Sequence, residues 1–302
     1  MGIRQEKMKI DIHAHLWPPE RTSPAMRANL EARGLNAGEV LSHEGILNAE
    51  TGVCDAVCIQ TMAFDGSRTN EELKASHDYA TAAMKKYPGR IYAFCNIDPH
   101  TPEASLTYLR RYIEDAGFIG LKVHQNVQEV YANDQRLFPV YKAMQEYGLP
   151  VMYHTGGIGL VPLFDKYSDI AAIDEVACRY PELPIILGHA GRGKYAETAS
   201  ILRKHANVYA DVSTNFAKQA GREHELMAEL IITVKRYCGK TDRLLFGTDY
   251  PFYAVPSDTA NLIDRSAEAY PDDITRAEAE AIKEVNAATF LGKYAGLQYP
   301  IL

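Results

Sequence analysis

The sequence lacks the features that mark membrane-spanning and secreted proteins. No stretch approaches the ~18 consecutive apolar residues that a membrane-spanning helix needs. The opening residues, MGIRQEKMKI, contain no apolar segment followed by a cleavage site, so no secretory signal is predicted. The chain also has no internal repeat, low-complexity segment or linker that would divide it. These absences favour one cytoplasmic domain that does not act at a membrane.

Cysteine and clustered positive charge are also scarce. The five cysteines are odd in number and scattered, which argues against a disulfide framework and fits a reducing compartment. The formal net charge is −7, and no group of neighbouring Lys and Arg residues offsets it. Because such a surface repels phosphate backbones, binding to nucleic acid is disfavoured. The expected partner is a small-molecule substrate.

Short apolar runs are spaced along the chain and predict β-strands. Most are rich in Val, Ile, Tyr or Phe, and near-continuous apolar runs are typical of parallel strands that are covered on both faces. The runs are MKIDIH (8–13), VCDAVCIQ (53–60), RIYAFCNI (90–97), FIGLKVH (118–124), LPVMYH (149–154), LPIILGH (183–189), ANVYADVS (206–213) and RLLFGTD (243–249).

Amphipathic segments of helical period separate these runs. The segment 70–87 begins at Asn70, which is expected to cap the helix, and ends in lysines before a Pro-Gly pair. The segment 101–117 has Thr101 as its cap and Pro102 at its first helical position. Further helices are predicted over 133–147, 168–180, 193–205, 223–237, 257–270 and 275–291.

This alternation predicts an α/β fold, a single-domain (β/α)₈ TIM barrel over residues 1–302. An open doubly wound sheet is the alternative, but it needs a glycine-rich turn after the first strand, where this chain has HAHLWPPE. The first connection, 16–50, is long enough to hold a lid insertion over the site. The segment 275–291 is expected to close the chain as a C-terminal helix.

Polar residues interrupt or end the apolar runs on the side of the barrel where active sites form. They are His13 and His15 at the end of the first run, Lys122 and His124 in the fourth, His154 in the fifth, His189 in the sixth and Asp249 in the eighth. Because side chains alternate along a strand, His13 and His15 share a face, and Asp11 is expected on that face as a supporting residue.

The residue types in this set suit a metal ion. Three imidazoles, from His13, His15 and His154, and the carboxylate of Asp249 make a ligand set for Zn²⁺ or a similar ion, with one position open for water. Taken singly, the HxH pair can end a strand, His154 can be a core histidine, and Asp249 can form a turn before Pro251. Their joint occurrence at matching strand ends favours the metal site.

Other residues are weaker candidates for the site. Polar residues near other strand ends that could contact a substrate are Asn96, Arg192 and Asp211. Aromatic residues that could be either core or the lining of a substrate pocket are Trp17, Tyr250, Phe252 and Tyr253.

Together these motifs resemble the amidohydrolase superfamily, and within it the branch called amidohydrolase family 2. The matching pieces are DIHAH, GLKVHQ, LPVMYHTG, LPIILGHAG, LLFGTDYP and NAATFLG, which occur in this order from the first strand to the last helix. The resemblance implies a barrel of metal-dependent hydrolases, a group that also contains nonoxidative decarboxylases of aromatic or muconate-type acids. It also implies a homodimer.

The resemblance further implies roles for the metal ligands and for His189. One catalytic metal would be held by His13, His15, His154 and Asp249, with Zn²⁺ as the expected ion and Mn²⁺, Fe²⁺ or Co²⁺ as alternatives. His189 would act as a catalytic acid/base or polarise a carbonyl. Some relatives hydrolyse lactones without any metal, so the motif does not by itself guarantee an ion.

Lys122 and His124 are candidates for substrate binding or for a second metal. In two-metal members of the superfamily, a lysine of the fourth strand takes up CO₂ and bridges the ions. The residues themselves also allow Lys122 to pair with a substrate carboxylate. One metal is the favoured interpretation.

Three functions stay open from the sequence. The leading hypothesis is hydrolysis of a small carboxylate, lactone or amide by a metal-activated water, with Asp249 as proton carrier and His189 as oxyanion donor. The second is metal-dependent nonoxidative decarboxylation of an aromatic or muconate-type acid. The third is a metal- or ligand-binding barrel without catalysis, which the presence of Asp249 and His189 disfavours.

Overall fold

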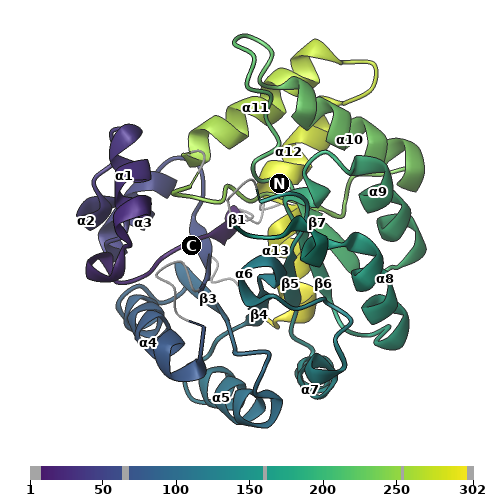
Figure 1. Cartoon of the computed structure of the whole chain (residues 1–302). Coiled ribbons are helices and arrows are strands. Elements are labelled where there is room, and N and C mark those ends of the chain that lie inside the picture. Colours follow the sequence, from purple (N-terminus) through teal and green to yellow (C-terminus); the bar gives the residue numbers. More distant parts are fainter. Residues whose placement is uncertain (1–7, 63–67, 159–161, 253–254, 298–302) are drawn as a thin grey trace, which may run out of the picture.

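The structure is a computed structural model that describes residues 8–62, 68–158, 162–252 and 255–297. Eight parallel strands follow one another around a single sheet in chain order. They are β1 (Ile10–Ala14), β2 (Ala56–Gln60), β3 (Ile91–Cys95), β4 (Gly120–Val123), β5 (Val151–His154), β6 (Ile185–Gly188), β7 (Val208–Asp211) and β8 (Leu244–Leu245). A bridge between Ala14 and Tyr250 closes the sheet. The predicted single-domain TIM barrel is therefore confirmed (Figure 1).

Helices follow the strands and form an outer ring around the barrel (Figure 1). After β2 to β8 these are α4 (Asn70–Lys86), α5 (Pro102–Glu114), α7 (Phe138–Tyr147), α8 (Ile170–Arg179), α9 (Tyr195–Lys204), α10 (Glu225–Cys238) and α11 (Pro256–Ala269). The short helix α6 (Gln125–Gln128) directly after β4 lies inside this ring (Figure 1). The alternation of strands and helices that was predicted from the sequence is thus confirmed.

Two details of the predicted helices are wrong. Helix α4 is capped by Thr69, which forms a reciprocal capping box with Glu72, so Asn70 is the first helical residue. The segment 275–291, predicted as one C-terminal helix, contains two helices, α12 (Arg276–Glu284) and α13 (Asn286–Tyr294). They meet at Val285, whose ψ of −45° is combined with a φ of −120° that is not helical.

The strands separate two hydrophobic clusters. Cys58, Met152 and Ile186 belong to the cluster inside the barrel. Val57 and Ile59, the neighbours of Cys58 in β2, belong to the larger cluster between the strands and the outer helices. This division follows from the alternation of side chains along each strand.

Helix α13 covers the end of the barrel where the strands begin. Its Phe290 and Leu291 belong to the inner cluster together with Ile10 at the start of β1. Phe290 also packs edge-on against Tyr209 of β7, with ring centroids 4.7 Å apart. With this end closed by apolar packing, the polar side chains of the barrel gather at the opposite end, where the strands finish.

The long first connection packs onto the side of the barrel. It contains α1 (Pro24–Ala32), α2 (Ala37–Val40) and α3 (His43–Glu50), and α3 contacts β2 and α11 in the outer ring (Figure 1). Leu30 and Leu41 are fully buried in the outer cluster. The guanidinium of Arg33, after α1, donates hydrogen bonds to the carbonyls of Pro251 and Phe252. The insertion is thus joined to the segment after β8, and a lid role for 16–50 stays a prediction.

Within the described ranges, no helix combines the length and the apolar character that crossing a membrane requires. The five cysteines are free thiols, in agreement with the absence of a disulfide framework. Burial raises the pKa of the Cys95 thiol well above its ordinary value, so this residue acts as a small apolar core residue.

Candidate metal centre

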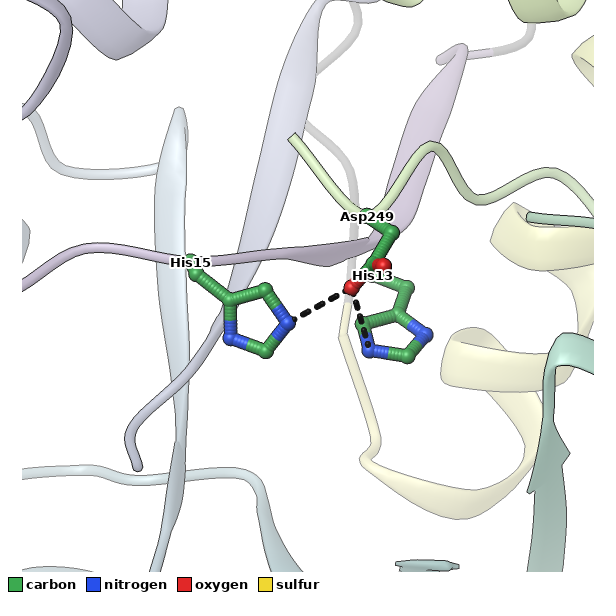
Figure 2. A group of neighbouring side chains, drawn as sticks. All are labelled: His13, His15 and Asp249. Carbon is green, nitrogen blue, oxygen red and sulfur yellow. Dashed lines mark hydrogen bonds and ion pairs between the residues drawn. The ribbon is translucent and has the colours of Figure 1, made fainter. Parts of the chain in front are cut away.

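His13, His15 and Asp249 converge where the strands of the barrel finish (Figure 2). The Nε2 atom of His15 lies 2.9 Å from Oδ1 of Asp249, and Nε2 of His13 lies 3.6 Å from the same oxygen. No side chain of the three is more than slightly exposed, and their ligand atoms lie within 4.8 Å of one another. The structure therefore brings together three of the four residues that are predicted to bind the metal.

An extra residue in β1 directs His13 into the barrel. Asp11 pairs with Val57 of β2 and Ala14 pairs with Ile59, so two residues of β1 lie opposite one residue of β2. Such a bulge re-aims the side chains beside it, and bulges are common next to active sites. The alternation that would place His13 and Asp11 on one face is interrupted here.

Asp11 accordingly does not share the face of His13, which corrects the sequence prediction. Its partner Val57 belongs to the outer cluster. The Asp11 carboxylate accepts hydrogen bonds from the backbone N–H of His13 at 2.8 Å and from the hydroxyl of Thr248 at 2.5 Å. Asp11 thus holds the bulge in β1 against the segment that carries Asp249.

Each histidine of the DIHAH motif has its Nδ1 atom beside a fixed acceptor. Nδ1 of His15 lies 2.9 Å from the backbone carbonyl of Gln60, and Nδ1 of His13 lies 2.9 Å from the carboxylate of Asp211. Because these oxygens only accept, the Nδ1 atoms carry the protons and the ring lone pairs lie on Nε2. Both lone pairs face the Asp249 carboxylate, an arrangement that a cation between them would stabilise.

The fourth predicted ligand, His154 at the end of β5, lies beside this group but outside it. Its Nδ1 atom lies 3.1 Å from Nε2 of His189, and the His189 ring lies 4.8 Å from the His13 ring. The Nε2 atom of His154 is buried and has no hydrogen-bond partner in the described part of the chain. Burying such a nitrogen without a partner is costly, so this atom fits a metal ligand.

Lys122 and His124 line the same end of the barrel. Lys122 is fully buried, and its Nζ atom lies 3.2 Å from Nε2 of His13. Burial lowers the pKa of Lys122 to about 8. The His124 ring stacks on that of His154, with centroids 4.3 Å apart. Both residues thus lie beside candidate metal ligands, Lys122 beside His13 and His124 beside His154.

Asp211 at the end of β7 is part of the site in a way that the sequence did not predict. Its carboxylate is fully buried and accepts hydrogen bonds from His13, from the Ser213 hydroxyl, and from the backbone N–H groups of Ser213 and His189. Burial alone would raise its pKa, but contact with His13 and Ser213 holds the pKa of Asp211 below its ordinary value. The signal in the sequence was a polar residue, Asp211, that follows the apolar stretch VYA within the seventh run.

Two other weak candidates from the sequence are held by the protein itself. The side-chain amide of Asn96 donates to the backbone carbonyl of Lys122 at 3.0 Å, so it links β3 to β4. The guanidinium of Arg192 donates to the Gly157 carbonyl at 2.9 Å and, through Nη2, to the Thr214 hydroxyl at 2.9 Å. These contacts explain the positions of both side chains near strand ends.

Several residues around the site adopt a backbone conformation that L-amino acids rarely use. Positive φ angles between 40° and 64° occur at His189, Ala190 and Arg192 after β6, Thr214 after β7 and Asp249 after β8. Such conformations cost free energy and cluster at functional sites, where the surrounding structure fixes them. Their grouping after three consecutive strands marks this end of the barrel as the functional one.

Burial favours the neutral form of His15, His154 and His189. It lowers the pKa of His15 to about 4, and it lowers the pKa of both His154 and His189 well below the ordinary value. Burial would raise the pKa of Asp249, but its close contacts with His15 and His13 lower that pKa on balance. At neutral pH these three imidazoles are neutral and Asp249 is a carboxylate, the forms that bind metal ions.

Two aromatic side chains form a wall beside His15. Trp17 stacks on Phe252, with centroids 5.6 Å apart and an interplanar angle of 16°. Phe252 in turn packs edge-on against His15 at 5.0 Å. Trp17 and Tyr250 are buried, Phe252 is half-buried, and Tyr253 lies outside the described residues. The wall therefore belongs both to the core and to the surroundings of the candidate metal ligands.

The donor set fits a divalent metal ion. Nε2 atoms of His13, His15 and His154 supply three nitrogens, and Asp249 supplies an oxygen, which suits Zn²⁺, Mn²⁺, Fe²⁺ or Co²⁺. Two observations carry the fit, namely the unpartnered Nε2 atom of His154 and the lone pairs of the DIHAH histidines that face a carboxylate.

Comparison with known proteins shows the family and the fold of the chain. The family model described as amidohydrolase matches residues 10–293. Gamma-resorcylate decarboxylase of Polaromonas sp. strain JS666 is 23% identical over 281 residues, which cover 78% of this chain and 82% of that protein.

Solved structures share the fold at low sequence identity. An uncharacterized TIM-barrel protein of Bordetella bronchiseptica superposes with a TM-score of 0.70 at 20% identity, covering 95% of this chain and 99% of that one. Dihydroxybenzoic acid decarboxylase of Polaromonas sp. JS666, with bound manganese and the inhibitor 2-nitroresorcinol, superposes with a TM-score of 0.66 at 18% identity, covering 97% and 100% of the two chains.

Proposed function

Because the chain belongs to the amidohydrolase family, with the family model matching residues 10–293, we propose that it is a metal-dependent nonoxidative decarboxylase of a small aromatic acid. The sequence alone favoured hydrolysis. Two of the three proteins named above are decarboxylases, and they favour the second hypothesis instead. Hydrolysis by the same residues becomes the rival outcome of the experiment below.

The observation that carries the proposal is the convergence of ligand atoms at the strand ends. The ligand atoms of His13, His15 and Asp249 lie within 4.8 Å of one another, and the Nε2 atom of His154, whose ring contacts His189, is buried without a partner in the described part of the chain. We assign one divalent metal ion to these four residues. Since a manganese ion is bound in the Polaromonas structure, Mn²⁺ is tested alongside Zn²⁺.

The chemistry divides between the metal and the residues around it. When bound, the ion supplies Lewis-acid polarisation of a substrate oxygen. In the reaction the bond between the ring carbon and the carboxylate breaks, CO₂ leaves, and the electron pair that stays on the ring carbon takes up a proton. The residues must therefore bind an anion, orient a ring and carry one proton.

Asp249 is the residue that we assign to proton transfer. Its lowered pKa keeps it a carboxylate at neutral pH, so it is free of a proton and can take one from an acidic hydroxyl of the substrate and pass it to the ring carbon. His189 is the alternative, but its Nδ1 atom lies 2.8 Å from the Ser213 hydroxyl and its Nε2 atom lies 3.1 Å from His154. Both of its nitrogens are thus already hydrogen-bonded.

Lys122 and the aromatic wall are assigned to substrate binding. The Lys122 ammonium lies in a site with little access to water, where a charged hydrogen bond to the substrate carboxylate would be strong. The stacked pair of Trp17 and Phe252 offers an apolar, planar surface next to His15, which suits an aromatic ring. These features favour an aromatic acid over an aliphatic amide.

The test is product analysis with two substrate panels on metal-loaded and metal-stripped protein. One panel contains hydroxylated benzoic acids, including gamma-resorcylate, and release of CO₂ or bicarbonate is measured. The other contains lactones and amides, and hydrolysis is measured. We expect CO₂ release from at least one acid only when metal is present. Hydrolysis without CO₂ release would contradict this proposal and support the hydrolase hypothesis. No turnover of either panel would support the third hypothesis, a binding barrel without catalysis.

Asp249→Asn tests the role of Asp249 in proton transfer, because it keeps the shape of the side chain and removes its charge. We expect its kcat to fall by at least ~100-fold, as for the loss of a general acid–base group. Metal content is measured on the same sample, so that loss of the ion and loss of proton transfer can be told apart. Turnover close to that of the wild type would show that the role of Asp249 is wrong.

A further inference from the structure

We propose that Asp211 is a positioning residue that fixes the ring tautomers of two metal ligands at once, His13 directly and His154 through Ser213 and His189. The inference rests on the proposed function only in taking these histidines as metal ligands. It assigns a role to the end of β7 and explains why His189 lies between a serine and another histidine.

The direct branch runs from Asp211 to His13. Oδ2 of Asp211 lies 2.9 Å from Nδ1 of His13, and both side chains are fully buried. The carboxylate can only accept, so the His13 proton is held on Nδ1 and the lone pair is presented on Nε2. Partners of this kind set the tautomer and the orientation of metal-bound histidines.

The second branch starts at the other oxygen of Asp211. The Ser213 hydroxyl donates its one proton to Oδ1 of Asp211. Ser213 Oγ lies 2.8 Å from Nδ1 of His189, and toward that atom the hydroxyl can now only accept. Nδ1 of His189 must therefore carry a proton, which leaves a lone pair on Nε2 of His189.

The lone pair of His189 then decides the state of His154. Nε2 of His189 lies 3.1 Å from Nδ1 of His154, so this contact is a hydrogen bond only if His154 donates from Nδ1. The proton of His154 is thus fixed on Nδ1, and its Nε2 atom, which is buried without a partner, presents a lone pair. A single carboxylate in this way prepares two ligands from opposite sides of the barrel.

The Thr214 hydroxyl could set the opposite state. It lies 3.1 Å from Nδ1 of His189 and accepts two hydrogen bonds from Arg192, at 3.2 Å and 2.9 Å, so its own proton is available to donate. Donation from Thr214 to Nδ1 would move the His189 proton to Nε2 and would place the His154 proton on its metal-facing nitrogen. The closer contact with Ser213, fixed by Asp211, prevents this.

Two conservative variants separate the branches. In Asp211→Asn, the amide oxygen must take the Oδ1 position, because two backbone N–H groups and Ser213 donate there. The amide nitrogen then faces Nδ1 of His13 and moves the His13 proton to Nε2. In Ser213→Ala, the bond to His189 is lost while the contact between Asp211 and His13 stays, so only His154 changes state.

The experiment measures Mn²⁺ affinity by calorimetry and histidine tautomers by ¹⁵N NMR on metal-stripped protein. We expect each variant to bind Mn²⁺ roughly 10- to 100-fold more weakly than the wild type. In the NMR spectra, Asp211→Asn should convert His13 to the Nε2–H form, and Ser213→Ala should convert His154. Asp98→Asn is the control, since Asp98 is a buried carboxylate after β3 whose bonds go to His100 and Thr101.

The outcomes separate this inference from the proposed function. Wild-type protein that binds Mn²⁺ and releases CO₂, with unchanged affinity and tautomers in both variants, would overturn the role of Asp211 alone. Wild-type protein that binds no metal would overturn both. If Asp211→Asn fails to fold, as judged by circular dichroism, the tautomer change of His154 in Ser213→Ala still decides the second branch.

Discussion

Lys122 is the residue whose role most directly distinguishes the alternatives left open by the sequence. It is fully buried in the barrel with its ammonium beside Nε2 of His13. A lysine in this place can bind a substrate carboxylate, or it can take up CO₂ and bridge two metal ions. The two roles affect different kinetic constants, so one substitution can separate them.

We predict that Lys122→Met raises KM for the acid substrate roughly 10- to 100-fold, because a hydrogen bond to a charged group contributes about 1.5–3 kcal/mol. Methionine keeps the length of the side chain and removes the charge. Steady-state kinetics with Lys142→Met, on the exposed surface of α7, as the control will measure the effect. A fall in kcat at constant KM, together with two metal ions per wild-type chain, would identify Lys122 as a carboxylated bridge instead.

At the scale of single elements, the turn after β6 stores backbone strain beside the site. Ala190 is fully buried with φ of 47° and ψ of 37°, a conformation that glycine adopts at lower cost than alanine. The turn keeps this geometry because His189 on one side and Arg192 on the other are fixed by hydrogen bonds. Backbone strain of this kind is common at functional sites whose side chains are held in fixed positions.

We predict that both Ala190→Gly and Ala210→Gly lower the free energy of unfolding, and that the loss is about 1 kcal/mol smaller for Ala190→Gly. Only at Ala190 does the substitution relieve a left-handed backbone conformation, and this relief offsets part of the lost packing. Ala210 is equally buried but lies in the regular strand β7. Urea denaturation of the two variants gives the comparison. Equal destabilisation would mean that the turn after β6 is not strained.

The insertion between β1 and β2 contains a buried carboxyl group. Glu50 at the end of α3 is fully buried. Burial and the negative charge of the nearby Asp11 raise the pKa of Glu50 well above its ordinary value. The folded protein therefore keeps a proton that the unfolded chain releases above pH ~4.5.

It follows that the free energy of unfolding falls as pH rises above the unfolded pKa of Glu50, by roughly 1 kcal/mol per pH unit, until the folded group itself loses its proton. Glu50→Gln cannot titrate and should remove this part of the pH dependence. Urea denaturation at pH 5 and pH 8 measures it in both proteins. If Gln at this position leaves the pH dependence unchanged, Glu50 is ionised in the folded protein.

The elements also show which parts of the site could be read from the sequence. His13, His15, His154 and Asp249 were predicted because each interrupts or follows an apolar run, a local signal. The outward position of Asp11 was not predicted, because the bulge depends on the register between β1 and β2. Register is set by contacts between segments far apart in the chain, and one sequence does not display them.

At the scale of the whole molecule, closure of the barrel creates the site. The bridge between Ala14 and Tyr250, and the bond from the His15 N–H to the Tyr250 carbonyl at 2.7 Å, bring the two ends of the sheet together. Asp249 reaches the DIHAH histidines only through this closure. The order of strands was predictable from the alternation of apolar runs and helices, and with it the side of the barrel that carries the site.

The roles of Asp211 and of the insertion needed the three-dimensional structure. Asp211 at the end of β7 contacts His13 of β1, 198 residues away in sequence. Arg33 of the insertion reaches the carbonyls of Pro251 and Phe252, more than 200 residues away. Polar groups that bind to the backbone or to other side chains carry no periodic pattern, so their partners become visible only once the chain is folded.

The central claim is that the strand ends of this barrel hold one metal ion, and metal content per chain tests it most directly. Elemental analysis of the wild type and of the His13→Ala/His15→Ala double variant, each loaded with Mn²⁺ or Zn²⁺ and then dialysed, gives the number. We predict about one ion per wild-type chain and almost none in the variant. No ion in the wild type, or equal content in both proteins, would contradict the account.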